Sequence, residues 1–425
     1  MATVGSSRNS NIDTPRFRAF AALRHHDFAL LWLGQIVSVT GSQMQLTALH
    51  WHVWQLSKSP FALGMLGFFR GAPIILCSLA GGVFADAVDR KRLMILMQMV
   101  MLASATCLTI ITMAGLTHVW PIYLLTALPS AASAFDTPAR QSLMPSLVPA
   151  RDFANAVSLG VTVFYVAMIG GPALAGLLLA SRGPAVVYAI NAVSYLAVIA
   201  ALLAMRTSGR PVQQEGETGS EISFAALKQG LRFVWSTPII VQTMTLDFAA
   251  TFFASATALL PIFADRVLNV GARGYGLLAA GPAMGAVITG LIMARMGTFR
   301  NQGKLIIGSV AVFGLATAAF GLSHVFWFSL LMLSLAGSAD MVSTVLRQTI
   351  RQLVTPDKLR GRMTSINMVF FMGGPQLGEV EAGTVAALFG APISVVTGGI
   401  GSILAAVIAL VRAKSLLKYD GNTEV

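Results

Sequence analysis

Residues 81–94, GGVFADAVDRKRLM, concentrate charge in a chain that has little of it. Five charged residues fall within seven positions there: Asp86, Asp89, Arg90, Lys91 and Arg92. Charged residues make up 11% of the 425-residue chain and hydrophobic residues 55%. The cluster lies between two apolar runs of roughly 20 residues, the length that an α-helix needs to cross the hydrocarbon core of a bilayer. These runs predict two membrane-spanning helices joined by a short polar turn.

Apolar runs of this length recur along the whole chain, whose mean hydropathy is +0.73. Such a composition, with 40 glycines, exceeds that of soluble globular proteins and predicts an all-α membrane protein with twelve transmembrane helices. The twelve spans are expected near residues 28–54, 62–85, 93–115, 119–136, 154–180, 184–205, 238–263, 274–296, 304–322, 326–346, 364–388 and 392–412. Residues 1–26 are polar and basic, so a cleaved signal peptide is not expected.

The longest polar interruption, RTSGRPVQQEGETGSEI at 206–222, falls in the middle of the chain. Its composition and its lack of an apolar period are typical of a flexible linker. The next stretch, 223–238, has apolar residues on one side of a helix, which predicts a short amphipathic helix at the membrane surface. The expected domains are an N-terminal cytoplasmic segment (1–27), a six-helix half (28–205), a linker with the amphipathic helix (206–237), a second six-helix half (238–412) and a cytoplasmic tail (413–425).

Lys and Arg residues predict the orientation of the spans in the membrane. Of the 29 such residues, Arg70 lies within a span and four lie in the predicted outer loops: Lys58, Arg182, Arg266 and Arg273. The remaining 24 fall on the side that carries both termini, so both termini are expected in the cytoplasm, in a bacterial inner membrane. This distribution accounts for the net charge of +12 without a nucleic acid partner, because the cations are not gathered on one soluble face.

The two halves of the chain repeat each other. The most similar stretches follow the predicted spans 4 and 10: PARQSLMPSLVPARDFANA at 138–156 and LRQTIRQLVTPDKLRGRM at 346–363. Arg140-Gln141 corresponds to Arg347-Gln348 at an offset of 207 residues, and a Gly-Pro pair recurs further along at an offset of 203. Two six-helix halves in parallel repeat are typical of secondary transporters, whose substrate site lies between the halves near the middle of the membrane.

The stretch at 81–94 resembles the signature loop of the major facilitator superfamily, which reads Gly, three residues, Asp, Arg, any residue, Gly, Arg, and Arg or Lys. Four positions match: Gly82, Asp86, Arg90 and Lys91. Ala87 replaces the usual Arg, and Asp89 replaces the usual Gly. With FDTPARQSLMPSLVPARDFANAVSL and GLRFVWSTPII, the chain is similar to the transmembrane secretion effector branch, which includes enterobactin exporters and macrolide efflux proteins. The resemblance covers nearly the whole chain and implies alternating access by two rocking halves.

Asp86 has a physical role available that does not depend on the resemblance. At the cytoplasmic end of span 2, its carboxylate can face the positive N-terminal end of a neighbouring helix, which is worth about 0.3–1 kcal/mol. The resemblance implies that this neighbour is span 11, so the contact would join the halves when the outer side is open. The cations of the loop would face anionic lipid. The alternative, a loop that only follows the distribution of positive charge, leaves both aspartates unexplained.

Ionisable residues inside the predicted spans are candidates for function, because burying a charge in a membrane is costly. Arg70 lies in the outer half of span 2, where it could bind an anionic substrate, pair with a buried acid or extend to the outer headgroups. Asp247 in span 7 is the first candidate for a proton carrier, with a hydrogen-bonded structural role as the alternative. Asp340 in span 10 is a further candidate, and a structural pairing with Arg347 or Arg351 is the alternative.

Glu379 and Glu381 lie two residues apart on span 11, so they point about 200° apart around the helix. Both are candidates for proton coupling, but they cannot share one facing site. Glu379 follows the helix-bending residues and is the better candidate to face the central site. Glu381 is then expected to pack toward a neighbouring helix.

Two Gly-Pro motifs predict bent and closely packed helices. Pro removes a backbone donor and bends a helix, and Gly allows another helix to approach. The candidate positions are Gly171, Pro172 and Gly176 in span 5 and Gly374 and Pro375 in span 11. The motif in span 5 resembles one common in proton-driven exporters, although the usual second Gly beside Gly176 is absent; general kinking is the alternative.

Other classes of function lack their signals in the sequence. No phosphate-binding loop for ATP occurs, and neither the six His nor the two Cys residues have metal-ligand spacing. No enzymatic activity and no cofactor are therefore expected. His50 and His52 are expected at the outer end of span 1, where they would anchor the helix at the interface together with Trp51.

The sequence as a whole predicts a monomeric, proton-coupled exporter of a small amphiphilic molecule. A siderophore, a drug and an amphiphilic metabolite all fit this expectation. Two alternatives stay open: an importer or uniporter of a small metabolite, and a receptor or scaffold that has the fold but does not transport. The buried acids favour transport, because a protein that does not transport has little reason to keep charges at this desolvation cost.

Overall fold

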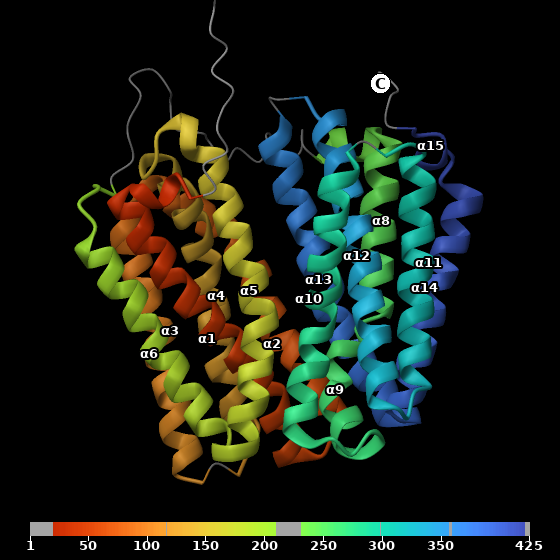
Figure 1. The fold of residues 1–425 in the computed structure, drawn as a ribbon, viewed down its shortest axis with the longest axis horizontal. Helices are drawn as coiled ribbons and strands as arrows, with labels where there is room; N and C mark the ends of the chain where they lie inside the picture. The colour runs from red at the N-terminus through yellow and green to blue at the C-terminus, as the bar shows by residue number, and fades with distance from the viewer. Residues whose placement is uncertain (1–19, 116, 210–230, 298, 357–358, 421–425) are drawn as a thin grey trace, which may run out of the picture.

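The computed structural model describes residues 20–115, 117–209, 231–297, 299–356 and 359–420 (Figure 1). These residues form helices joined by short connections, and no strand occurs among them. The first half contains η1 (Ala22–Arg24), α1 (His26–Ser57), α2 (Pro60–Ala87), α3 (Arg90–Met113), α4 (Trp120–Leu143), η2 (Met144–Ser146), α5 (Ala150–Arg182) and α6 (Pro184–Ala204). The second half contains α8 (Pro238–Phe253), η3 (Ala256–Leu259), α9 (Leu260–Ile262), η4 (Phe263–Val267), α10 (Gly271–Met296), α11 (Gln302–Gly321), α12 (Phe326–Val354), α13 (Arg360–Phe389), α14 (Ala391–Arg412) and α15 (Lys414–Leu417).

Long apolar helices dominate the described residues, which confirms the all-α fold. Nine segments among these residues are long and apolar enough to cross a membrane. The helices α1, α4 and α13 are long as well but do not reach this apolarity. Their sequences carry more polar residues, among them a buried aspartate in α4 and two glutamates in α13. The predicted count of twelve spans therefore stays a prediction.

The predicted span 238–263 corresponds to an apolar segment, Pro238–Val267, that is long enough to cross a membrane but is not one regular helix. Helix α8 ends at Phe253, and a 3-10 turn, a short α-helical turn and a π-helical turn follow it. Ala254 leaves the helical conformation with a ψ of 35°. Pro261 lacks a backbone donor, so it can start a new turn but cannot continue the hydrogen bonds of α8.

The segment between the halves is described only at its two ends. The backbone N–H groups of Arg206 and Thr207 donate to the Asp27 carboxylate at 3.1 and 2.7 Å, which holds the start of the linker against α1. Residues 231–236 are helical, and the amphipathic helix predicted over 223–238, most of which lies outside the described residues, stays a prediction. Residues 210–230 lie outside the described residues, so the predicted linker stays a prediction there.

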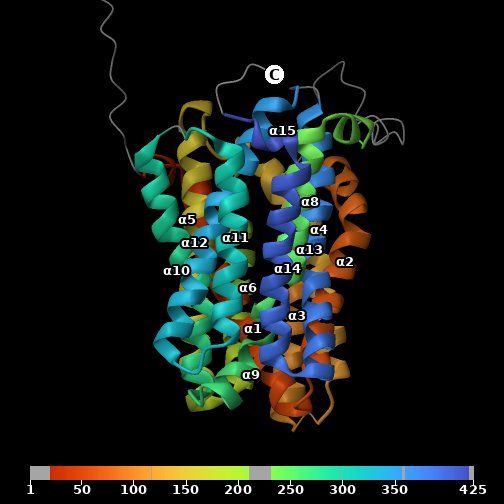
Figure 2. The same cartoon turned by 90° about the vertical axis from the view of Figure 1, so that its right-hand side faces the viewer.

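The helices form two groups that lie side by side, α1–α6 and α8–α14 (Figures 1 and 2). Helix α15 and the start of α1 lie at the same end of the molecule, which we call the terminal end. The opposite end is called the distal end. Two pairs of long helices pack extensively between the groups: α2 with α13, and α5 with α10.

Glycines allow the two halves to approach closely near the distal end. A Cβ atom at Gly64 of α2 would lie 2.6 Å from the backbone oxygen of Glu379, and one at Gly383 of α13 would lie 2.7 Å from the Gly64 Cα. A Cβ atom at Gly176 of α5 would lie 2.8 Å from the Cα of Gly276 on α10. Side chains at these positions would push the halves apart. We call Gly64, Gly176, Gly276 and Gly383 the glycine seam.

Gly171 and Gly374 of the Gly-Pro motifs pack within their own half, whereas the Pro172 carbonyl oxygen lies against Gly276 of α10. A Cβ atom at Gly171 would lie 2.5 Å from a side-chain atom of α1, and one at Gly374 would lie 2.5 Å from a side-chain atom of α8. Pro172 and Pro375 lie inside α5 and α13, which both continue past them. The motifs therefore occur where close packing is needed, and Pro172 and Gly176 extend that packing to α10 of the other half.

Polar contacts join the halves at the distal end as well. Trp54 Nε1 donates to Asp265 Oδ2 at 2.8 Å, and Lys58 Nζ lies 3.2 Å from the same carboxylate oxygen. The Tyr275 hydroxyl donates to the Thr47 carbonyl oxygen at 3.1 Å. With the glycine seam, these contacts close the distal end. Toward the terminal end, the two groups of ribbons diverge (Figure 1).

Candidate transport site

An ion pair joins the two halves on the inner side of the glycine seam. Arg70 Nη1 of α2 lies 3.3 Å from Glu379 Oε1 of α13, and the two side chains are 23% and 10% exposed. Gly67 faces Glu379, where a Cβ atom would lie 2.6 Å from the Glu379 Cβ. The missing side chain at Gly67 therefore leaves room for the carboxylate between the halves. Of the three options open for Arg70, the structure shows a pairing with a buried acid.

His50 of α1 is the third member of this cluster, although its place in the sequence predicts the membrane interface. Its Nδ1 atom lies 3.0 Å from the Leu46 carbonyl oxygen, and its Nε2 atom lies 3.8 Å from Glu379 Oε2. The residue is buried because α1 continues to Ser57, two helical turns further. In the sequence, the apolar and aromatic residues that continue after His50 indicate that the helix extends past it and buries it. We call Arg70, Glu379 and His50 the inter-half cluster.

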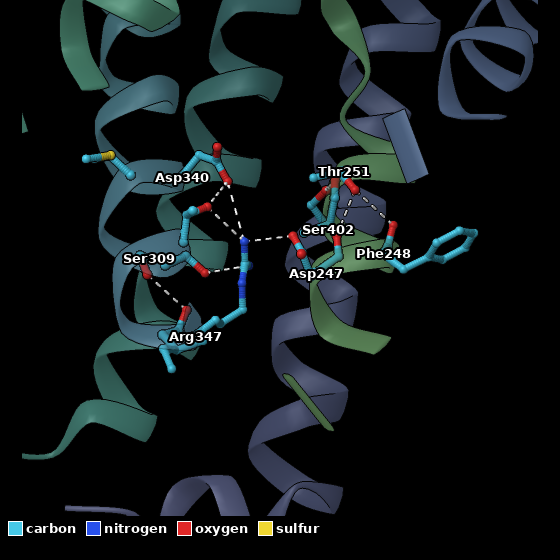
Figure 3. Close-up of polar contacts among 12 residues, drawn as sticks. Asp247, Phe248, Thr251, Ser309, Asp340, Arg347 and Ser402 are labelled. Atoms are coloured by element: carbon cyan, nitrogen blue, oxygen red, sulfur yellow. Dashed lines mark hydrogen bonds and ion pairs between the residues drawn. The ribbon is translucent and has the colours of Figure 1, made fainter. Parts of the chain in front are cut away.

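The second half contains a buried network of its own, centred on Arg347 of α12 (Figure 3). Arg347 Nη2 lies 2.7 Å from Asp247 Oδ1 of α8, and the two side chains are 2% and 4% exposed. The same nitrogen lies 3.8 Å from Asp340 Oδ1, whose side chain is 46% exposed. The guanidinium also donates to the hydroxyls of Ser343 and Thr344, at 2.6 and 3.0 Å. Asp247 is thus the buried counter-ion of Arg347, and Asp340 is the more accessible acid.

Arg140 of α4 occupies the corresponding place in the first half. Its Nη1 atom donates to Gln35 Oε1 of α1 at 2.9 Å, and its Nε atom lies 3.8 Å from Asp136 Oδ2. Asp136 is buried and accepts a hydrogen bond from Gln98 at 3.1 Å. Each half therefore bonds its repeated arginine to its own first helix. Asp136 is a functional candidate that the search for charges within spans did not single out; its spacing of four from Arg140 was the available signal.

The described part of the signature loop binds the ends of other helices. Asp89 caps α3, because its Oδ1 accepts a hydrogen bond from the Arg92 backbone N–H at 3.1 Å. Arg90 donates to a carbonyl oxygen at the end of α4 at 3.0 Å, and Lys91 donates to one at the end of α6 at 2.7 Å. Basic side chains stabilise helix C-termini in this way. These two cations therefore fasten three helix ends of the first half together.

The rest of the signature loop lies outside the described side chains, which omit residues 79–87. The backbone of α2 extends through Gly82 and Asp86 to Ala87. The contact of Asp86 with the helix of span 11, which is α13, stays a prediction.

Other candidate groups lie apart from these networks. Glu381 is partly buried and forms no ion pair with any described residue. Cys77 and Cys107 are free thiols. Within the described ranges, no group of three or more His, Cys, Asp or Glu side chains could hold a metal ion. The central candidates are therefore the inter-half cluster and the network around Arg347.

Comparison with known proteins identifies the family. A family model described as transmembrane secretion effector matches residues 17–422. The chain belongs to the transmembrane secretion effector family. This secretion effector is a multi-pass membrane transporter of the major facilitator type, not an enzyme, and the family implies a small-molecule substrate.

Sequence relatives of this chain include two curated exporters. The enterobactin exporter EntS of Shigella boydii serotype 18 is 23% identical over 401 residues, which cover 93% of this chain and 94% of the relative. The EntS protein of Escherichia coli O81 matches with the same identity and coverage.

Solved structures confirm the predicted major facilitator fold. A bacterial homolog of the human lysosomal transporter Spinster, in an inward-facing and occupied conformation, has a TM-score of 0.73 at 14% identity, covering 93% of this chain and 98% of that one. A POT family transporter in complex with a thioalcohol conjugated peptide has a TM-score of 0.72 at 13% identity, covering 92% of this chain and 96% of that one. The nucleoside transporter NupG has a TM-score of 0.68 at 15% identity, covering 92% of this chain and 99% of that one.

Proposed function

We propose that this secretion effector is a proton-coupled exporter of a small amphiphilic molecule, such as a siderophore or a drug, in a bacterial inner membrane. The direction is supported by the EntS relatives, which are named enterobactin exporters. A cytoplasmic location of both termini is supported by the excess of Lys and Arg on their side of the predicted spans. In this orientation the terminal end faces the cytoplasm, and the closed distal end faces outward.

The observation that carries proton coupling is the buried ion pair of Arg70 and Glu379. Because α2 and α13 belong to different halves, this pair can exist only while the distal end is closed. A proton on Glu379 would cancel its attraction for Arg70, so proton binding and closure of the distal end depend on each other. A change in the protonation of Glu379 can therefore shift the halves between two states.

Side chains near the middle of the interface support an amphiphilic substrate. The Tyr165 hydroxyl of α5 donates to Met341 Sδ of α12 at 3.2 Å, so an aromatic and a thioether group from different halves meet there. The neighbouring Asp340 is the half-exposed acid of the Arg347 network. Small-molecule sites combine an apolar lining with a few polar groups, and methionine adapts its shape to varied ligands.

Uptake into everted membrane vesicles tests this function. A growth panel of a sensitised host, challenged with siderophore precursors and amphiphilic antibiotics, first selects the substrate. A potential of 100 mV supplies ~2.3 kcal/mol per charge, enough for roughly 50-fold accumulation. Uptake should therefore collapse with a protonophore at constant ATP. If ATP depletion alone stops uptake while the proton gradient persists, the proposed energy source is wrong.

Variants of α13 connect this test to the site. Glu379→Gln should abolish uphill uptake and spare downhill equilibration, because the substituted side chain can no longer exchange a proton. Glu381→Gln is the matched control, since Glu381 lies two residues along the same helix and outside the ion pairs of the described residues. If right-side-out vesicles concentrate the substrate instead, the importer alternative is favoured.

A further inference from the structure

Two buried polar atoms face each other across the halves without a hydrogen-bond partner. Nε2 of His50 and Oε2 of Glu379 are 3.8 Å apart, and neither makes a hydrogen bond with the described residues. This distance is too long for a hydrogen bond. Buried polar groups are normally paired, so an unpaired facing couple in a transporter requires an explanation. A single proton between the two atoms would provide the missing bond.

The other ring nitrogen of His50 shows where such a proton would go. Nδ1 faces the Leu46 carbonyl oxygen at 3.0 Å, and a carbonyl can only accept a hydrogen bond. Nδ1 therefore carries a hydrogen in every charge state that keeps this bond. In the neutral ring Nε2 is then bare, and its lone pair faces a carboxylate oxygen. The free position for a further proton is Nε2, in line with Glu379.

Charged and polar groups reach this pair from two other helices, α2 and α10, and from α13 itself. Arg70 of α2 pairs with the other carboxylate oxygen, Oε1, at 3.3 Å. Tyr275 of α10 lies close enough to feel the charge of Glu379, but its hydroxyl donates to the Thr47 carbonyl oxygen. Gln376 of α13 is buried nearby, with an Oε1 atom that has no partner in the described structure. Among the described residues, Arg70 forms an ion pair with Glu379, and His50 lies within ion-pair distance of it and is charged only when protonated.

We infer that the inter-half cluster binds two protons in sequence, His50 accepting the first and Glu379 the second. The cluster thereby acts as a latch, a contact that holds the distal end closed until the second proton binds. The inference deepens the proposed proton coupling and rests on it. The first proton binds His50 Nε2, which then donates a charge-assisted hydrogen bond to Glu379. Two cations of the first half then hold one carboxylate of the second half, and the distal end is closed most firmly.

The second proton reverses this balance. Once Glu379 is protonated, Arg70 and the charged His50 are two like charges with no anion between them. Uncompensated cations are costly inside a membrane protein, so the halves separate and water reaches both residues. His50 therefore sets the acidity at which the latch opens, because its charge opposes the protonation of Glu379.

Distances between spin labels measure the latch without substrate or gradient. Labels are placed at exposed residues near the distal end of each half, Arg182→Cys and Leu322→Cys, in a Cys77→Ser/Cys107→Ser background. Pulsed electron resonance on the purified protein in nanodiscs then follows the closed population from about pH 8 to about pH 4. The parent should keep the short distance at neutral pH and lose it in acid.

Variants of His50 and Glu379 test the direction of the predicted shift in the midpoint pH. His50→Asn can still donate to the Leu46 carbonyl but cannot take up a proton. The pH at which half of the molecules are open should therefore rise by about 1–3 units. If His50→Asn folds poorly, His50→Gln replaces it and should shift the midpoint pH in the same direction. Glu379→Gln should favour the open state at every pH. His52→Asn is the matched control, because this buried histidine contacts Tyr188 at 3.1 Å on the far side of α1 and should leave the midpoint unchanged.

The latch and the proposed function can fail separately. Equal midpoints for the parent, His50→Asn and His50→Gln, or a downward shift, would overturn the role of His50. If the latch titrates as expected but export survives a protonophore, proton coupling is wrong and the latch stands as a pH-sensitive closure. If export needs the proton gradient but the latch does not titrate, the coupling stands and its protons bind elsewhere.

Discussion

The guanidinium of Arg347 lies 2.7 Å from the carboxylate of Asp247, and both side chains are almost completely buried. Arg140, the matching residue of the first half, contacts the amide of Gln35 in the same way. On the first helix of each half, the partner of the repeated arginine is therefore a carboxylate in the second half and a neutral amide in the first, where the acid near Arg140 is Asp136 of its own helix. Asp247 and Arg347 belong to the same half, so a proton on Asp247 would not separate the halves, whereas Glu379 pairs with Arg70 of the other half. This difference places Glu379 ahead of Asp247 as the candidate proton carrier.

Removing the charge of Asp247 should destabilise the protein. Asp247→Asn removes the buried counter-ion of Arg347 and leaves the half-exposed Asp340 carboxylate 3.8 Å away, so the cost should approach the roughly 3–5 kcal/mol of breaking a buried ion pair. Thermal unfolding in detergent, followed by fluorescence-detected gel filtration, measures the loss. The double variant Asp247→Leu/Arg347→Met should recover most of it. Asp340→Asn is the control, because that side chain is half exposed and should unfold close to the parent; an Asp247→Asn protein as stable as the parent would refute the structural role.

A side chain in the glycine seam should keep the distal end from closing. Gly176→Val introduces a Cβ atom 2.8 Å from the Gly276 backbone, whereas Gly170→Val, on the same helix, meets no atom within 4 Å. A cysteine at the buried Thr47, without the native cysteines, reports closure through its rate of reaction with a water-soluble maleimide. The rate should rise in Gly176→Val only. Equal rates in the two valine variants would show that the seam does not control closure.

The two aspartates of the signature loop should differ in their effects. Asp86→Asn should reduce transport while the protein still reaches the membrane, because its carboxylate is expected to face a helix N-terminus when the outer side is open. Asp89→Ala should lower stability by about 0.5–2 kcal/mol through loss of the α3 cap, with turnover per folded molecule unchanged. Transport normalised to membrane protein, beside a melting curve, separates the two. Normal transport by Asp86→Asn would remove the proposed contact with α13.

Cysteine labelling in spheroplasts tests the orientation of the termini. A cysteine at Lys418, after α15 at the terminal end, should react with an impermeant reagent only after the membrane is opened. A cysteine at His118, in the connection between α3 and α4, should react in intact spheroplasts. The charge bias of the loops is the reason for this expectation. The reverse pattern would place the distal end in the cytoplasm.

Hydropathy predicted most helices closely, because apolar length and membrane thickness constrain each other. Helix α14 covers Ala391–Arg412 against a predicted 392–412. The break after α8 depends on local backbone geometry within an apolar run, which hydropathy does not detect. Charges inside apolar runs drew attention to Arg70 and Glu379, which pair with each other in the structure. Their pairing could not be predicted, because 309 residues separate them and each belongs to a different half.

The glycine seam also bears on how easily the transporter can cycle. Glycine has no side-chain rotamers to immobilise, and the backbones that meet at the seam are already ordered within their helices. A contact between leucines would lose about 0.5–1 kcal/mol of side-chain entropy per residue at each closure. The seam can therefore form and separate with little change in conformational entropy. The seam therefore adds little to the conformational work that the membrane potential must perform, and one charge that crosses a membrane at 100 mV supplies ~2.3 kcal/mol for it.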